Sequence, residues 1–161
     1  MNRPSHFFNI ESADQLFDLL KTVASKLANS DEKRTEDFLL LVFGLTHLRE
    51  WIAPDYDWKE RRPTTPEEHF FQDIYKFDEF KFLQALCNRS KHMCVTETAM
   101  GALYKSVKDP VSNLDSALKP DGRRLVGYFA NGKDIEDVIR AVIKFYEDKW
   151  FQKDGNSRIA T

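Results

Sequence analysis

Residues 77–94 read FDEFKFLQALCNRSKHMC, and this stretch predicts the helix around which the rest of the chain is arranged. Its apolar residues recur at spacings of three and four or their sums, which is the periodicity of one helical face. These residues are Leu83, Leu86, Cys87 and Met93. Its other side gathers polar groups within little more than one turn, namely Asn88, Arg89, Lys91 and His92. An amide, two cations and an imidazole so close together form the most site-like cluster of the sequence.

Capping patterns predict where other helices begin. Ser12 with Gln15 three residues later resembles a capping box, and the helix it opens ends at residues 29–31. The run 65–68, Thr-Pro-Glu-Glu, opens another helix. Whether residues 66–93 form one helix or two stays open, although a break near Phe77, with Asp78 as a new cap, is favoured. Asp134 caps the last helix, which ends near residues 150–151.

A helix beginning within residues 31–36 and stopped by Pro54 has the broadest apolar face. Its main stripe is Phe38, Leu41, Leu45, Leu48 and Ile52, widened by Leu40 and Phe43. Such breadth indicates a central helix that touches several neighbours.

These patterns together predict the fold class. Residues 124–130 favour a strand, and Asn131-Gly132 is a turn signal, so a small β element precedes the last helix. Short connections favour antiparallel neighbours. We therefore expect a mainly α protein, an antiparallel bundle of four to five helices with a small β element before the last one. Residues 1–152 form one domain, and residues 153–161 form a disordered tail.

Composition narrows the function classes. The 161 residues are 42% hydrophobic and carry a formal net charge of −2, which argues against a broad phosphate-binding surface. Cys87 and Cys94 lie two helical turns apart, about 10 Å, which is too far for a disulfide. No signal-peptide pattern and no apolar run long enough to cross a bilayer is present. We expect a cytoplasmic protein with no membrane partner.

The cysteines and histidines do not predict a metal site. Cys87, His92 and Cys94 would supply three ligands, and His47 or His69 a fourth. The spacing matches no zinc pattern, and the two cysteines share the apolar stripe while His92 points away from it. We expect no metal and no other cofactor.

Lys91 of the polar cluster is a candidate binding residue, and two further groups supply the other candidates. His47 and Glu50 share a helix face, and we expect them to contact the face that carries Asn88 and His92. The run 59–62, Lys-Glu-Arg-Arg, follows Tyr56 and Trp58, as in loops that contact nucleic acid. Arg61 and Arg62 are its candidate residues, although the acidic neighbours offset much of their charge.

The Asn88–His92 pair late in a long helix resembles the HEPN superfamily of prokaryotic helical domains. Its active members carry an arginine, usually followed by Asn, His or Asp, and a histidine a few residues later. Here Asn88 falls on the polar position, His92 on the histidine, and Cys87 on the arginine. The resemblance covers residues 12–93 and the last helix.

Active members of that superfamily cleave RNA as dimers, so the resemblance implies a homodimer with an RNA or protein partner. Because Cys87 replaces the arginine, we expect a non-catalytic interaction or dimerisation module of a bacterial stress or phage-defence system. The alternative is metal-independent RNA cleavage, in which His92 is the general acid or base, Arg89 clamps the phosphate and Asn88 orients the groups. Both remain open at the level of the sequence.

Overall fold

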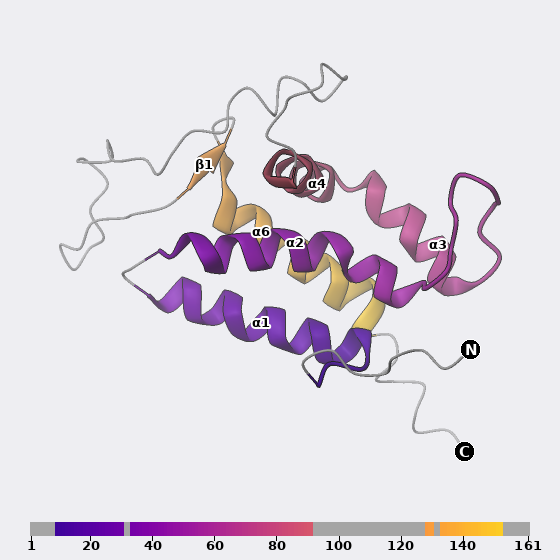
Figure 1. The fold of residues 1–161 in the computed structure, drawn as a ribbon, viewed down its shortest axis with the longest axis horizontal. Coiled ribbons are helices and arrows are strands. Elements are labelled where there is room, and N and C mark those ends of the chain that lie inside the picture. The colour runs from indigo at the N-terminus through magenta and orange to yellow at the C-terminus, as the bar shows by residue number, and fades with distance from the viewer. Residues whose placement is uncertain (1–8, 31–32, 92–127, 131–132, 153–161) are drawn as a thin grey trace.

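The computed structural model describes residues 9–30, 33–91, 128–130 and 133–152, which are mainly helical (Figure 1). The α-helices in these ranges are α1 (Ala13–Asn29), α2 (Thr35–Ile52), α3 (Pro66–Asp73), α4 (Asp78–Lys91) and α6 (Ile135–Tyr146). A 3-10 turn, η1 (Ile74–Lys76), leads from α3 towards α4, and a π-helical turn, η2 (Glu147–Phe151), continues α6. The predicted mainly α bundle with a small β element before the last helix is confirmed.

The β element is a pair of two-residue strands. β1 (Phe129–Ala130) runs antiparallel to β2 (Lys133–Asp134), with Phe129 opposite Asp134. β2 leads directly into α6, where the Asp134 side chain accepts a hydrogen bond from the Glu136 N–H at 2.9 Å. The predicted cap of the last helix is therefore confirmed. The predicted turn at 131–132 and the strand residues 124–127 lie outside the described residues.

Local signals placed the other helix starts well. Ser12 Oγ accepts from the Gln15 N–H at 3.2 Å at the start of α1. At α3, Thr65 and Glu68 form the reciprocal capping box that their spacing predicts. The break between α3 and α4 is also confirmed, because Phe77 has extended backbone angles between η1 and α4. Asp78 is the first residue of α4 and not its cap.

α2 is the central helix, as predicted, and contacts α1, α3, α4 and α6. Its stripe of Phe38, Leu41, Leu45, Leu48 and Ile52 is buried. The prediction that Leu40 widens this stripe is wrong, because its side chain is 43% exposed. Val42 is buried instead, so the buried face extends from Leu41 in the opposite direction around the helix.

The helices are not all aligned. In Figure 1, α1 and α2 lie side by side in opposite directions, with α6 behind α2, while α4 is seen almost along its axis. α1 and α2 approach closely at Gly44, where an added Cβ would collide with Leu20 Cδ2. Leu20 is fully buried, so a larger residue at position 44 would force its side chain to shift within the packed core.

Tyr146, the last residue of α6, fixes that helix against α2. Its ring is fully buried and packs against Phe17, Phe70 and Phe151, with ring centroids 5.6 to 6.4 Å apart. Its hydroxyl donates to the Leu45 carbonyl oxygen of α2 at 2.8 Å. Burial raises the pKa of this phenol far above its ordinary value, so the hydroxyl remains a donor.

The predicted disordered tail, residues 153–161, also falls outside the described residues. None of the helices in the described ranges combines the length and apolarity that crossing a membrane requires.

Candidate functional site

The end of α4 carries the predicted cluster only in part. Asn88 and Arg89 lie on the last two turns of α4, both partly buried, and Lys91 is its last residue. Asn88 Oδ1 accepts a hydrogen bond from Gln84 Nε2 at 3.3 Å, one turn earlier. His92 lies outside the described residues. The helical placement of Asn88 and Arg89 is thus confirmed, whereas their geometry relative to the imidazole stays a prediction.

His47 faces α4, where the residue it meets is Cys87, and Glu50 is paired with His47. His47 Nδ1 lies 3.0 Å from Glu50 Oε2, and its Nε2 lies 3.9 Å from Cys87 Sγ. In such a row the carboxylate orients the imidazole, and the imidazole can accept the proton of the thiol to form a nucleophilic thiolate. Cys87, however, is 0% exposed, so no substrate reaches its sulfur in this conformation. The three groups form a polar contact between α2 and α4.

The same pair bears on metal binding. Within the described ranges, no group of three or more His, Cys, Asp or Glu side chains is arranged to hold a metal ion. Of the ligands weighed from the sequence, His47 and Cys87 are adjacent, His69 lies on α3, and Cys94 and His92 lie outside the described residues.

The predicted cationic loop is held by an internal clamp. Arg61 forms a two-pronged ion pair with Glu68 of α3, with Nη1 2.9 Å from Oε2 and Nη2 bonded to Oε1. The carboxylate also accepts from the Thr64 N–H at 2.8 Å and the Thr65 N–H at 3.3 Å. Arg61 stacks over Tyr56, 5.0 Å from its ring centroid. The loop is thereby fixed to α3, while Arg62 is exposed.

This clamp makes stability depend on pH. The Arg61 guanidinium lowers the pKa of Glu68 from an ordinary 4.5 to about 2. Because the pKa of Glu68 is lower in the folded state than in the unfolded state, its ionised carboxylate stabilises the fold fully above about pH 4.5. This stabilisation is lost as the pH falls towards 2. In urea unfolding, we expect wild type to exceed Glu68→Gln in stability by a constant margin above about pH 5.5 and by a shrinking margin below pH 4.5.

The control for this experiment is Glu67→Gln, the neighbouring carboxylate in the first turn of α3. Its margin to wild type is expected to be small throughout the titration. A Glu68→Gln margin that stays unchanged down to pH 3 would contradict the clamp.

The fixed loop forms one wall of a hollow of about 540 Å³, which we call the aromatic hollow. Its other walls are the C-terminal part of α2, the α3–η1 segment and α4. Rings and amides line most of it: Trp58, Phe71, Tyr75, Gln72, Gln84 and Asn88. The charged groups that line it are Arg49, Glu50 and Lys76. Trp58 is 54% exposed and Tyr75 45%, so their rings are open to a ligand.

Arg49 occupies the floor of the aromatic hollow and is surrounded by rings. Its guanidinium carbon lies 4.2 Å from the ring centroid of Phe71, 5.2 Å from that of Phe80 and 5.6 Å from that of Tyr75. Nη1 donates to the Phe71 carbonyl oxygen at 3.4 Å and Nη2 to Gln84 Oε1 at 3.5 Å. Both hydrogen bonds are long, and therefore weak.

The charge of Arg49 is incompletely compensated. Within the described part of the chain, its buried Nε has no hydrogen-bond acceptor and its guanidinium forms no ion pair with a carboxylate. Burial lowers the pKa of Arg49, although an arginine remains charged at neutral pH. A partly buried guanidinium whose N–H groups form only weak hydrogen bonds can gain stronger ones from an anionic ligand group.

A neighbouring hollow of about 530 Å³ shares four residues with the first: Arg49, Glu50, Trp58 and Phe71. We call it the acidic hollow, because it adds Asp55 and Asp57 and only one further cation, Lys59. Asp57 Oδ1 accepts from the Lys59 N–H at 2.9 Å, and Lys59 lies over the Trp58 ring. Trp58 therefore stands between two hollows of different charge.

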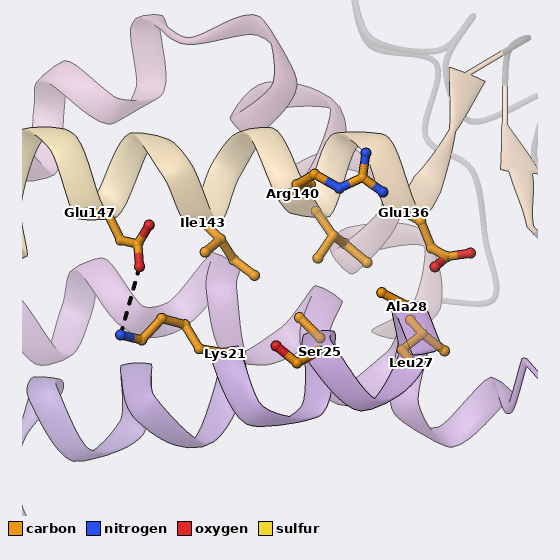
Figure 2. A pocket seen from close by; sticks show the side chains of 10 residues that line it. Lys21, Ser25, Leu27, Ala28, Glu136, Arg140, Ile143 and Glu147 are labelled. Atoms are coloured by element: carbon orange, nitrogen blue, oxygen red, sulfur yellow. Dashed lines mark ion pairs between the residues drawn. The ribbon is translucent and has the colours of Figure 1, made fainter. Parts of the chain in front are cut away.

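A third hollow, about 260 Å³, lies between α1 and α6 (Figure 2). Small side chains of α1, Ser25 and Ala28, form one wall, and Ile143 lies on the other. Lys21 Nζ lies 3.7 Å from Glu147 Oε1 and joins the two helices at one end. None of the residues predicted for the site lines this hollow, whose lining combines apolar side chains with the charged groups Lys21, Glu136, Arg140 and Glu147.

The structure thus brings Glu50 and Asn88 together around the aromatic hollow, places His47 beside Cys87, and keeps Arg61 in the clamp. Arg49 is not among the residues that the sequence patterns predict for the site. A signal existed, because Arg49 lies four residues after buried Leu45 and three before buried Ile52, where helical periodicity calls for an apolar residue.

Comparison with known proteins adds no further constraint: no family model, no curated protein and no solved structure matches this chain.

Proposed function

We propose that this protein is a non-catalytic HEPN-like interaction module that holds its partner in the aromatic hollow. The observation that carries the proposal is the combination of exposed Trp58 and Tyr75 at the rim with Arg49 at the floor. Tryptophan, tyrosine and arginine supply a large share of the binding energy at protein interfaces. The volume of the hollow is also in the range of binding pockets.

The burial of Cys87 supports the non-catalytic part of the proposal. This residue stands at the arginine position of the motif, and its side chain is 0% exposed against His47. A group at that position would need access to a phosphodiester to stabilise its charge. The homodimer and the role in bacterial stress or phage defence rest on the sequence resemblance.

A site-specific photocrosslinker tests the interaction. p-Benzoylphenylalanine replaces Trp58 at the hollow in one variant and Trp51, 42% exposed but outside both hollows, in the control. On irradiation in cells of the native host, we expect one discrete adduct from position 58, with a partner protein or a second copy. We expect this adduct to disappear when Arg49→Gln is added. Equal labelling from both positions, or none from position 58, would contradict the proposal.

Incubation with RNA in the absence of divalent metal tests the catalytic alternative. We expect wild type, Arg89→Ala and His92→Ala to leave the RNA equally intact, since the motif lacks its arginine. Cleavage by wild type that His92→Ala abolishes would instead establish the ribonuclease reading. Sedimentation of the purified chain at two concentrations measures the predicted dimer.

A further inference from the structure

We infer that the aromatic hollow binds a peptide segment of a protein partner, with one carboxylate of the peptide on Arg49 and an aromatic side chain on Trp58 or Tyr75. This inference rests on the proposed function and adds the chemical class of the ligand. It depends on three observations: the incompletely compensated charge of Arg49, the balance of charges in the lining, and the nature of the remaining polar groups.

The Arg49 guanidinium selects for an acidic group. Its two hydrogen bonds to protein are 3.4 and 3.5 Å long, and its Nε has no acceptor within the described residues. The rings of Phe71 and Phe80 hold its plane in place, so little side-chain freedom is lost when a ligand binds. A carboxylate that replaces these long contacts forms charge-assisted hydrogen bonds, which are about twice as strong as neutral ones.

The balance of charges favours a peptide over a nucleic acid. The lining of the two hollows holds three cations, Arg49, Lys59 and Lys76, and three carboxylates, Glu50, Asp55 and Asp57. Lys76 is also paired with Asp73, its Nζ 2.6 Å from Oδ1. A strand of phosphates requires a cationic groove and would have to pass the carboxylates of the acidic hollow. A single carboxylate confined to Arg49 avoids them.

The remaining groups suit a peptide backbone. Gln72 of α3 and Gln84 and Asn88 of α4 contribute three amides to the lining. Gln72 Nε2 donates to Tyr56 Oη at 2.7 Å and Gln84 Nε2 to Asn88 Oδ1 at 3.3 Å, and each amide nitrogen carries a second hydrogen that can be donated to a ligand. Trp58 and Tyr75 offer exposed ring faces for a planar or apolar side chain. The acidic hollow beyond Trp58 suits a basic residue further along the same peptide.

The test titrates the protein with terminally blocked peptides and follows the Arg49 Nε–H and Trp58 indole N–H signals by NMR. Each peptide carries one aspartate placed one, two or three residues from a phenylalanine, and each has an asparagine counterpart. We expect at least one aspartate peptide to shift both signals and to bind about tenfold more tightly than its counterpart. Adenosine 5′-monophosphate is the nucleotide arm and is expected to bind more weakly.

Substitutions in the hollow show which residues bind the peptide, and one of them, at an exposed position, controls for misfolding. Arg49→Gln and Trp58→Ala are expected to weaken binding of the same peptide about tenfold or more, whereas Trp51→Ala leaves it unchanged. Because Trp58 is exposed, Trp58→Ala keeps the test valid if Arg49→Gln does not fold.

Three outcomes would overturn the inference: equal binding of aspartate and asparagine peptides, no shift with any peptide, or tighter binding of the nucleotide. If the crosslinked adduct at position 58 still forms, such a result removes the peptide inference and leaves the proposed function standing. If the adduct is absent, the proposed function fails on its own.

Discussion

Tyr146→Ala is expected to lower the free energy of unfolding by about 4 kcal/mol, the range measured for deleting a buried aromatic ring. The ring is fully buried between α1, α3 and η2, where it touches Phe17, Phe70 and Phe151. Because these three rings belong to three different helical segments, they cannot move together to fill the cavity that the deleted ring leaves. The last helix would also lose its hydrogen bond to the Leu45 carbonyl oxygen of α2.

Urea unfolding of wild type, Tyr146→Ala and Tyr146→Phe separates the ring from its hydroxyl. The phenylalanine variant loses only the 2.8 Å hydrogen bond to the Leu45 carbonyl, at a cost of about 1 kcal/mol. That carbonyl remains within the hydrogen-bond pattern of α2, which keeps the cost low. Equal destabilisation by both variants would show that the hydroxyl and not the ring carries the stability.

Glu136→Gln is expected to cost about 3 kcal/mol, because it leaves a buried ammonium without its counter-charge. The Lys33 side chain is only 6% exposed, and its Nζ lies 3.1 Å from Glu136 Oε1. Nζ also donates to the Leu27 carbonyl at the end of α1, at 2.6 Å. The pair therefore joins the end of α1 and the segment before α2 to the first turn of α6.

The matched control replaces both charges with apolar side chains, Lys33→Met together with Glu136→Leu. Removing a buried pair as a whole is often neutral, so we expect this double variant to be closer to wild type than Glu136→Gln alone. Chemical unfolding of the three proteins at neutral pH measures the difference. A double variant as unstable as the single one would show that the hydrogen bond to Leu27 carries the effect.

The sequence predicted the features of the fold that depend on near neighbours. Ser12, Thr65 and Asp134 cap their helices through hydrogen bonds that span two or three residues, so the pattern and its cause lie in the same short stretch. The buried apolar stripe of α2 could likewise be predicted from the spacing of its residues. The prediction that Leu40 is part of the buried face was wrong, because a local pattern does not show on which side of the stripe the neighbouring helices pack.

The candidate site was harder to predict because it is assembled over long sequence separations. Arg49 meets side chains and carbonyls of residues 71, 75, 80 and 84, and these contacts exist only once the α3–α4 break has set the two helices at an angle. The motif at residues 87–92 was the predicted site because its polar residues are consecutive in the sequence. The contact of His47 with Cys87 confirms that α2 packs on α4, although on the buried side of α4.

One side chain serves two purposes where α3 gives way to α4. Arg49 contacts Phe71 near the end of α3 and Gln84 in the middle of α4, and the same guanidinium forms the floor of the aromatic hollow. Replacing it would disturb architecture and recognition together, whereas Trp58 and Tyr75 are exposed and can change at little cost to the scaffold. Over evolutionary time, ligand preference is therefore free to drift at the rim of the hollow while its floor is held constant.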